Sequence, residues 1–150
     1  MKVTRVPLKD VNQTGAAMSR LVTTYYKDLG KLLKLPFGAF FAFVKALPYV
    51  ADPKNEETVS RPCYSIRPSH SPRDCDDKAV LIGSYLFAAG IPFQFVAVAK
   101  NPGPLHHTFA IAIMPSGRRV HCDATYKENT LGENKGYARM IPISRILRRG

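Results

Sequence analysis

One stretch of the chain, residues 74 to 92, restricts the fold more than any other. It begins with the polar run Asp74-Cys75-Asp76-Asp77, continues as an apolar segment, and ends at Gly90 and Pro92. A glycine just past a helix and a proline soon after it are typical C-terminal signals, so we predict a helix from about Asp76 to Ala89. Because this segment is apolar on most faces, the helix should be central and buried.

Three candidate strands follow the central helix. Residues 93–99 are rich in aromatic and β-branched side chains, and residues 107–114 and 119–123 are the second and third candidates. Pro115-Ser116-Gly117-Arg118 predicts a hairpin turn between the last two. Residues 140–147 are expected to add a last short element. A buried helix packed on an antiparallel sheet predicts an α+β fold.

The part of the chain before the central helix divides into three segments. Residues 1–15 are expected to be an irregular arm, followed by helices from about Ala16 to Lys34 and from Phe37 to Leu47, where apolar residues recur at helical spacing. The proline-rich residues 48–74 read as a loop, and a long loop inside a compact domain is often functional. A length of 150 residues fits one domain, which we place at residues 16–150.

The formal net charge of +11 bears on partners and on location. It favours anionic partners, although no nucleic-acid-binding motif accompanies it, and a solvated basic surface is the simpler interpretation. Residues 16–47 permit two interpretations, a helical layer packed on the domain, which we favour, and a basic amphipathic membrane-binding region. We predict neither a signal peptide nor a transmembrane helix, because the most apolar stretch, residues 35–50, is short and contains Lys45.

The three cysteines, Cys63, Cys75 and Cys122, cannot all form disulfides within the chain and show no C-x-x-C spacing. We therefore expect a reducing compartment such as the cytoplasm. Three cysteines and four histidines would be enough ligands for zinc, but no pair has a recognised ligand spacing. A metal site is accordingly a weaker hypothesis than a thiol site, and no cofactor is expected.

Cys75 is the strongest candidate for a reactive side chain, because it stands where the proline-rich segment becomes the central helix. Free N–H groups and the positive end of the helix dipole stabilise a thiolate at such a position, and the same N–H groups can bind an oxyanion. The adjacent aspartates oppose this effect, because negative charge raises the pKa of a thiol. Catalysis by Cys75 therefore requires a base.

His107 and Asp123 are the expected partners of Cys75. His107 begins a strand whose alternate residues Phe109, Ile111 and Ile113 are apolar and expected to face the core, with His107 on their side. The hairpin returns Asp123 to the level of His107, where its carboxylate can orient the imidazole. Strict alternation, however, places His121 on the same face as Asp123, which requires either a bulge before Asp123 or a sheet covered on both faces.

These motifs together resemble the transglutaminase-like superfamily. The resemblance rests on Asp74-Cys75-Asp76-Asp77-Lys78-Ala79, on Gly90-Ile91-Pro92, on His107-x-Phe109 and on Asp123-Ala124-Thr125-Tyr126, within residues 49–126. It implies a papain-like cysteine peptidase fold with Cys75 as nucleophile, His107 as general base and acid, and Asp123 as the orienting residue. Short single-domain members of this kind occur in bacteria and phages, which implies a cytoplasmic or virion-associated protein.

Some positions depart from the family pattern. Ala124 stands where proline is common, the chain has no tryptophan, and His106 competes with His107. The oxyanion donor that often precedes the cysteine has only uncertain candidates, which are Tyr64, Ser65, Ser69 and His70.

The function expected from these residues is thiol-dependent acyl transfer or amide hydrolysis on a protein or peptide substrate. Protease, deamidase and crosslinking transglutaminase share the nucleophile chemistry and remain open alternatives. A catalytically silent basic structural or binding protein that keeps the fold is the rival hypothesis. Cys63, Cys122, His70 and His121 are expected to be structural or incidental.

Overall fold

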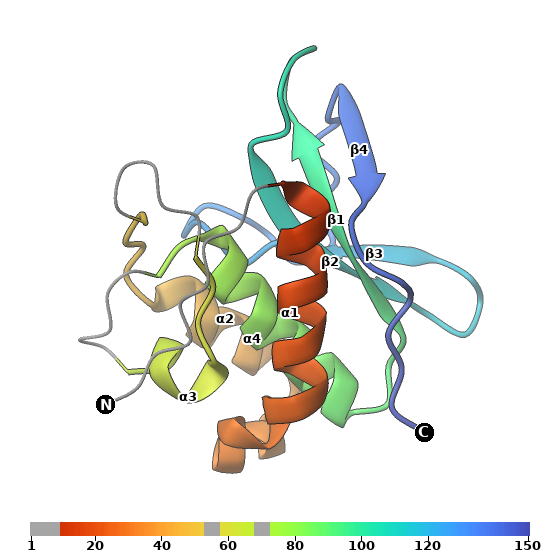
Figure 1. Ribbon diagram of the computed structural model, residues 1–150. Coiled ribbons are helices and arrows are strands. Elements are labelled where there is room, and N and C mark those ends of the chain that lie inside the picture. Colours follow the sequence, from red (N-terminus) through yellow and green to blue (C-terminus); the bar gives the residue numbers. More distant parts are fainter. Residues whose placement is uncertain (1–9, 53–57, 68–72) are drawn as a thin grey trace.

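A computed structural model describes residues 10–52, 58–67 and 73–150 of the chain. The elements run α1 (Val11–Tyr25), the 3-10 helix η1 (Tyr26–Lys34), α2 (Phe37–Ala46), α3 (Pro62–Ser65), α4 (Cys75–Ala88) and then the strands. The strands are β1 (Phe93–Ala99), β2 (His107–Ile113), β3 (Arg119–Cys122) and β4 (Arg139–Pro142). Figure 1 shows the helices gathered on one side of the sheet. The expected α+β class is therefore confirmed.

The buried helix predicted from the sequence is α4, and it begins one residue earlier than expected, at Cys75. Asp74 caps it by accepting hydrogen bonds from the Asp76 and Asp77 N–H groups, and the Asp77 carboxylate accepts from the Asp74 N–H. This reciprocal arrangement is a capping box, which satisfies donors that a helix start otherwise leaves free. Nearly every side chain from Asp76 to Phe87 is buried, as expected for a central helix.

The four strands form one antiparallel sheet in the order β3-β2-β1-β4. The predicted hairpin turn joins β2 to β3, where the Gly117 N–H donates to the Met114 carbonyl at 2.8 Å. The face that packs with α4 carries aromatic and small residues, which are Phe93, Phe95, Ala97, Ala110, Ala112 and Cys122. The small side chains let a helix approach the sheet closely.

The other face of the sheet corrects one expectation. Phe109 and Ile111 were expected to face the main core, but they form a separate buried cluster with Val96 and Val98, covered in part by Tyr137. The β2–β3 register continues without a bulge to Cys122, which lies opposite Ala110. The sheet is thus covered on both faces, which is one of the two arrangements that reconcile His107, His121 and Asp123 on a common side.

The N-terminal segment also differs from the prediction. The irregular arm was expected to reach residue 15, but α1 begins at Val11, because Asp10 caps the helix by accepting from the Gln13 N–H at 2.8 Å. Residues 1–9 lie outside the described part of the chain. The helix expected to end at Lys34 changes to 3-10 geometry at Tyr26, and Gly30 interrupts it with a left-handed φ of 52°.

The segment expected to be a loop, residues 48–74, contains more structure than predicted. It holds the short helix α3, and Val50 and Arg73 form an antiparallel bridge with both hydrogen bonds at 2.7 Å. The Arg73 side chain is fully buried and donates to the carbonyls of Pro48, Ser65 and Arg67. These bonds fix the backbone that leads directly into Cys75.

The helical layer contributes its apolar side chains to the main core. Met18 and Val22 of α1 and Phe40 and Val44 of α2 are fully buried in the cluster that includes α4. In the described part of the chain, none of the helices has the length and apolar character needed to cross a membrane.

The close contact between α4 and β1 gives the first prediction. A Cβ at Gly83 would lie 2.8 Å from Phe95 Cζ and 3.0 Å from Phe93 Cε2. Gly83→Ala should therefore lower the free energy of unfolding by about 1–3 kcal/mol, as overpacking does in well-packed cores. Urea unfolding followed by circular dichroism measures the change.

Gly38 of α2 provides the matched control, because it is exposed and a Cβ there would meet nothing within 4 Å. Gly38→Ala should raise the free energy of unfolding by about 0.5–1 kcal/mol through helix propensity. Equal effects of the two substitutions would contradict the packing described for α4.

Candidate active site

The cysteine singled out by the sequence occupies the first turn of α4. Cys75 lines a cavity of about 250 Å³ together with His107, Thr108, Asp76 and Asp10. The cavity therefore lies between the N-terminal end of α4, the start of β2 and the start of α1. The two residues expected to be nucleophile and base border the same space.

His107 and Asp123 form the expected pair. His107 Nε2 lies 2.7 Å from Asp123 Oδ2, and both side chains are buried. Asp123 follows the last residue of β3, and its other oxygen accepts from the Thr125 N–H at 3.2 Å. Because Nε2 faces the carboxylate, Nδ1 is the ring nitrogen that takes no part in this bond.

The two adjacent histidines, which both line the cavity, differ in their hydrogen bonds. His106 Nε2 accepts from the Lys100 N–H at 3.0 Å, so this imidazole closes the β1–β2 connection. His106 is exposed, whereas His107 is buried and bonded to Asp123. Only His107 combines a place in the cavity with a carboxylate partner among the described residues.

The Asp123 loop is tied to α4 by buried polar contacts. The Lys78 ammonium donates to the Thr125 carbonyl at 3.0 Å, and Asn129 Nδ2 donates to the Asp123 carbonyl at 3.1 Å. Burial lowers the pKa of Lys78 to about 8. Burial acts to raise the pKa of Asp123, but hydrogen bonds from His107 and Thr125 outweigh it, so the Asp123 pKa lies below its usual value. The carboxylate that faces His107 is therefore charged at neutral pH.

The thiol itself is not activated in the resting state. Burial raises the pKa of Cys75 well above its usual value, and the charges of Asp76 and Asp74 raise it further. The Thr108 N–H acts in the opposite direction by donating toward the sulfur. Asp76 is in direct contact, with Oδ1 at 3.6 Å from Cys75 Sγ. Cys75 is consequently a neutral thiol, which is the poorly nucleophilic form of cysteine.

Two tyrosines that the sequence analysis did not assign to the site lie beside it. The Tyr126 ring stacks on the His107 imidazole with centroids 6.0 Å apart, and Tyr49 packs on Tyr126 at 5.6 Å. Tyr126 belongs to the motif Asp123-Ala124-Thr125-Tyr126, on which the family resemblance partly rests. The sequence could therefore have indicated that Tyr126 lies near the site. Tyr49 has no local sequence signal, because only the Val50–Arg73 bridge brings it next to Asp74.

The remaining candidates lie away from this cavity or outside the described residues. Ser65 belongs to α3, and neither it nor Tyr64 lines the cavity. Ser69 and His70 lie outside the described part of the chain. Cys122 is buried in the main core and Cys63 packs near Asp28, whereas His121 is buried against Phe109 with ring centroids 5.3 Å apart.

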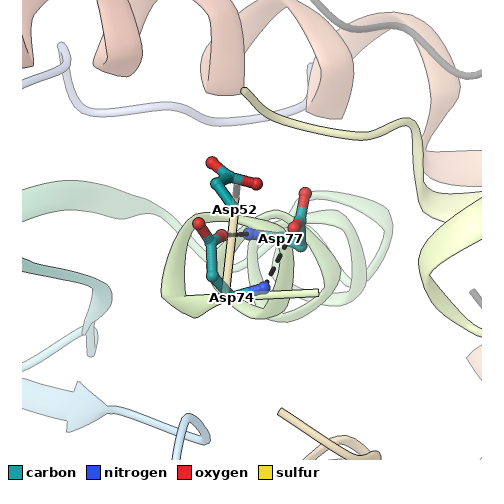
Figure 2. A group of neighbouring side chains, drawn as sticks. All are labelled: Asp52, Asp74 and Asp77. Carbon is teal, nitrogen blue, oxygen red and sulfur yellow. Dashed lines mark hydrogen bonds between the residues drawn. The ribbon is translucent and has the colours of Figure 1, made fainter. Parts of the chain in front are cut away.

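A group of carboxylates adjoins the site at the start of α4. Figure 2 shows Asp52, Asp74 and Asp77, whose oxygens lie within 4.8 Å of one another. Among the described residues this is the only group of three or more histidine, cysteine or acidic side chains close enough to share a metal ion. Three carboxylates suit a hard cation such as Ca²⁺. Each of them already accepts backbone N–H donors, which accounts for the cluster without a metal.

The same cluster makes stability depend on pH. Burial raises the pKa of Asp74 and of Asp77, and neighbouring carboxylates add to the effect. A carboxyl group whose pKa is higher in the folded state stabilises the fold below its unfolded pKa and loses this contribution as pH rises toward the folded pKa. The free energy of unfolding should therefore fall by about 1–3 kcal/mol between pH 5 and pH 8, as urea titrations would measure.

Asp52→Asn should reduce this fall, because it removes one of the negative charges facing Asp74. Glu128→Gln is the control, since Glu128 is exposed and outside the cluster, and it should leave the fall unchanged. Stability that rises from pH 5 to pH 8 in the unmodified chain would show that these carboxylates are not buried together.

The contact between Asp76 and the thiol gives a third prediction. Asp76→Asn removes the largest charge that raises the Cys75 pKa, so iodoacetamide should alkylate Cys75 about 3–10 times faster at pH 7. Peptide mapping by mass spectrometry measures the rate. Asp10→Asn is the control, because Asp10 lines the same cavity and asparagine preserves the helix cap. An unchanged or slower rate in Asp76→Asn would contradict the assigned cause.

Comparisons of the chain with protein-family models, with curated protein sequences and with solved structures gave no match.

Proposed function

We propose that the chain is a thiol-dependent acyl-transfer or amide-hydrolysing enzyme with Cys75 as nucleophile, His107 as general base and acid, and Asp123 as orienting residue. His107 Nδ1 takes the thiol proton while the sulfur attacks an amide carbonyl. The resulting oxyanion collapses to a thioester as the C–N bond breaks, and the imidazolium protonates the leaving amine. Water or a second amine then attacks the thioester and returns the thiol.

The observation that carries this proposal is the buried His107–Asp123 hydrogen bond of 2.7 Å beside a cavity that Cys75 also lines. A charged carboxylate on Nε2 fixes the imidazole tautomer and stabilises the imidazolium formed during attack. The raised pKa of Cys75 is compatible with this role, because proton transfer then accompanies attack instead of preceding it. The site works as a neutral triad, not as a preformed ion pair.

The finer fold assignment is part of the same proposal. A cysteine at the start of a buried helix, a histidine at the start of a strand and an aspartate after the next strand support a transglutaminase-like, papain-like arrangement. Their chain order, Cys75, His107 and Asp123, supports it too. We propose a protein or peptide substrate, and a cytoplasmic or, for a phage protein, virion-associated location.

Replacing the base or its orienting residue tests the proposal. His107→Ala should slow iodoacetamide alkylation of Cys75 at pH 7 by about 10²-fold or more, and Asp123→Asn should slow it to a smaller extent. Cys63 provides an internal reference in the same peptide map, because it lies outside the cavity. Labelling of Cys75 that is indifferent to His107 would contradict the assignment of the base.

A glutamine-containing peptide, incubated with and without a primary amine, separates the alternative reactions by mass spectrometry. Loss of ammonia with gain of the amine indicates transfer, conversion of the amide to an acid indicates deamidation, and chain cleavage indicates a protease. Cys75→Ser is the matched control and should abolish whichever product is seen. A product that persists in Cys75→Ser would exclude Cys75 as the nucleophile.

A second candidate function is a catalytically silent basic structural or binding protein of a virion or nucleoprotein assembly. The raised pKa of Cys75 and the net charge of +11 favour it. On this hypothesis the His107–Asp123 pair is purely structural. His107→Ala should then lower stability without any effect on Cys75 reactivity in the fraction that remains folded.

A further inference from the structure

The exposed aromatic pair beside the candidate triad has no role in the chemistry proposed above. Tyr49 and Tyr126 are 44% and 41% exposed, and their ring centroids lie 5.6 Å apart. Among the described residues only Met140 and Ile146 are comparably exposed large apolar side chains. Adjacent exposed aromatic rings are unfavourable in water and often mark a binding site.

Two different backbone segments hold the paired rings in place. The Val50–Arg73 bridge places Tyr49 next to Asp74, one residue before Cys75. Tyr126 stands three residues after Asp123, where its ring stacks on His107 at an interplanar angle of 23°. Burial raises the pKa of both phenols, and the next largest cause is the nearby Cys75 sulfur, as expected for rings beside it. The pair therefore spans the segment bearing the thiol and the segment bearing the carboxylate.

A second cavity of about 250 Å³ is lined by both tyrosines. Its wall includes Leu47, Pro48, Tyr49 and Tyr126 and is mostly apolar. The charged groups on its lining are three lysines, Lys45, Lys78 and Lys127, and one acid, Glu128. Such a lining accepts an apolar side chain and repels a cationic one.

We infer that Tyr49, Tyr126 and this cavity form a subsite for a large apolar, preferably aromatic, side chain of the polypeptide substrate, adjacent to the carbonyl that Cys75 attacks. The inference rests on the proposed function and specifies its substrate class. Aromatic rings that pair with tyrosines gain stacking energy in addition to buried area. A substrate alanine is too small to cover the tyrosine rings, which then stay in contact with water. A substrate lysine meets three lysines and one glutamate in the lining, so the net interaction is repulsive.

Peptidyl chloromethyl ketones test the subsite without knowledge of the natural substrate. The thiolate sulfur forms a bond to the methylene carbon of the probe, and chloride leaves. We use acetyl-capped probes that carry phenylalanine, alanine or lysine either one or two residues before the electrophile, and we follow Cys75 modification by intact mass and peptide mapping. In one of the two placements the phenylalanine probe should react about 10-fold or more faster than the alanine probe. The lysine probe should be no faster than the alanine probe.

Tyr49 is the residue to vary, because Tyr126 touches His107 and its loss would disturb the base. Tyr49→Ala should remove most of the phenylalanine preference, measured as the ratio of the phenylalanine rate to the alanine rate, and Tyr49→Phe should preserve this ratio. Met140→Ala is the matched control: Met140 is 46% exposed on β4 and does not line the cavity, so the preference should be retained.

Three outcomes overturn the inference. Equal rates for all probes in both placements, with Cys75 labelling still dependent on His107, remove the subsite and leave the proposed function intact. An equal loss of rate with every probe in Tyr49→Phe assigns the phenol to the reaction instead of to side-chain recognition. Failure of every probe to modify Cys75 removes the proposed function and the subsite with it.

Discussion

The burial of α4 between the helical layer and the sheet is the constraint on which the rest of the structure depends. Its apolar side chains meet Phe93, Phe95 and a row of alanines, and Gly83 allows the phenylalanine rings to approach its backbone. Since a buried helix start leaves N–H groups without partners, α4 requires the Asp74 cap. Packing thereby fixes the end of the helix at which Cys75 projects into the cavity.

Cys75 and His107 line one cavity although they belong to different layers of the molecule. Cys75 stands at the start of α4, and Thr108, next to His107, donates its N–H toward the sulfur. His107 shares the opposite face of the sheet with Phe109, His121 and Asp123. Adjacent residues of β2 therefore face the two parts of the candidate site: Thr108 faces the thiol and His107 faces the Asp123 carboxylate.

The electrostatics around Cys75 explain why the proposed mechanism needs a base. A helix N-terminus alone would favour the thiolate, but burial and two flanking carboxylates reverse this effect on Cys75. Asp74 caps the helix, and the Asp77 carboxylate accepts hydrogen bonds from the Asp74 and Ser60 N–H groups. The acids that stabilise the helix start thus oppose thiol ionisation, and in the proposed mechanism the Asp123 carboxylate compensates by stabilising the imidazolium formed on His107 during attack.

Local signals predicted α4, β1, β2 and the hairpin well, because each has a strong period and clear terminal residues. The pairing of His107 with Asp123 also followed from hairpin geometry. The prediction that Phe109 and Ile111 face the main core was wrong, because apolar alternation cannot reveal that the other face of the sheet is also covered. Tyr49 and Arg73 were missed, since their roles arise from a bridge between residues 50 and 73 that no local pattern indicates.

Acylation by p-nitrophenyl acetate tests the central claim most directly, because it requires no knowledge of the natural substrate. The account predicts that one acetyl group appears on Cys75 in the intact mass spectrum and is then hydrolysed, with both steps slowed strongly in His107→Ala. Acetylation spread over surface lysines, with Cys75 unmodified or modified at the same rate in His107→Ala, would contradict it.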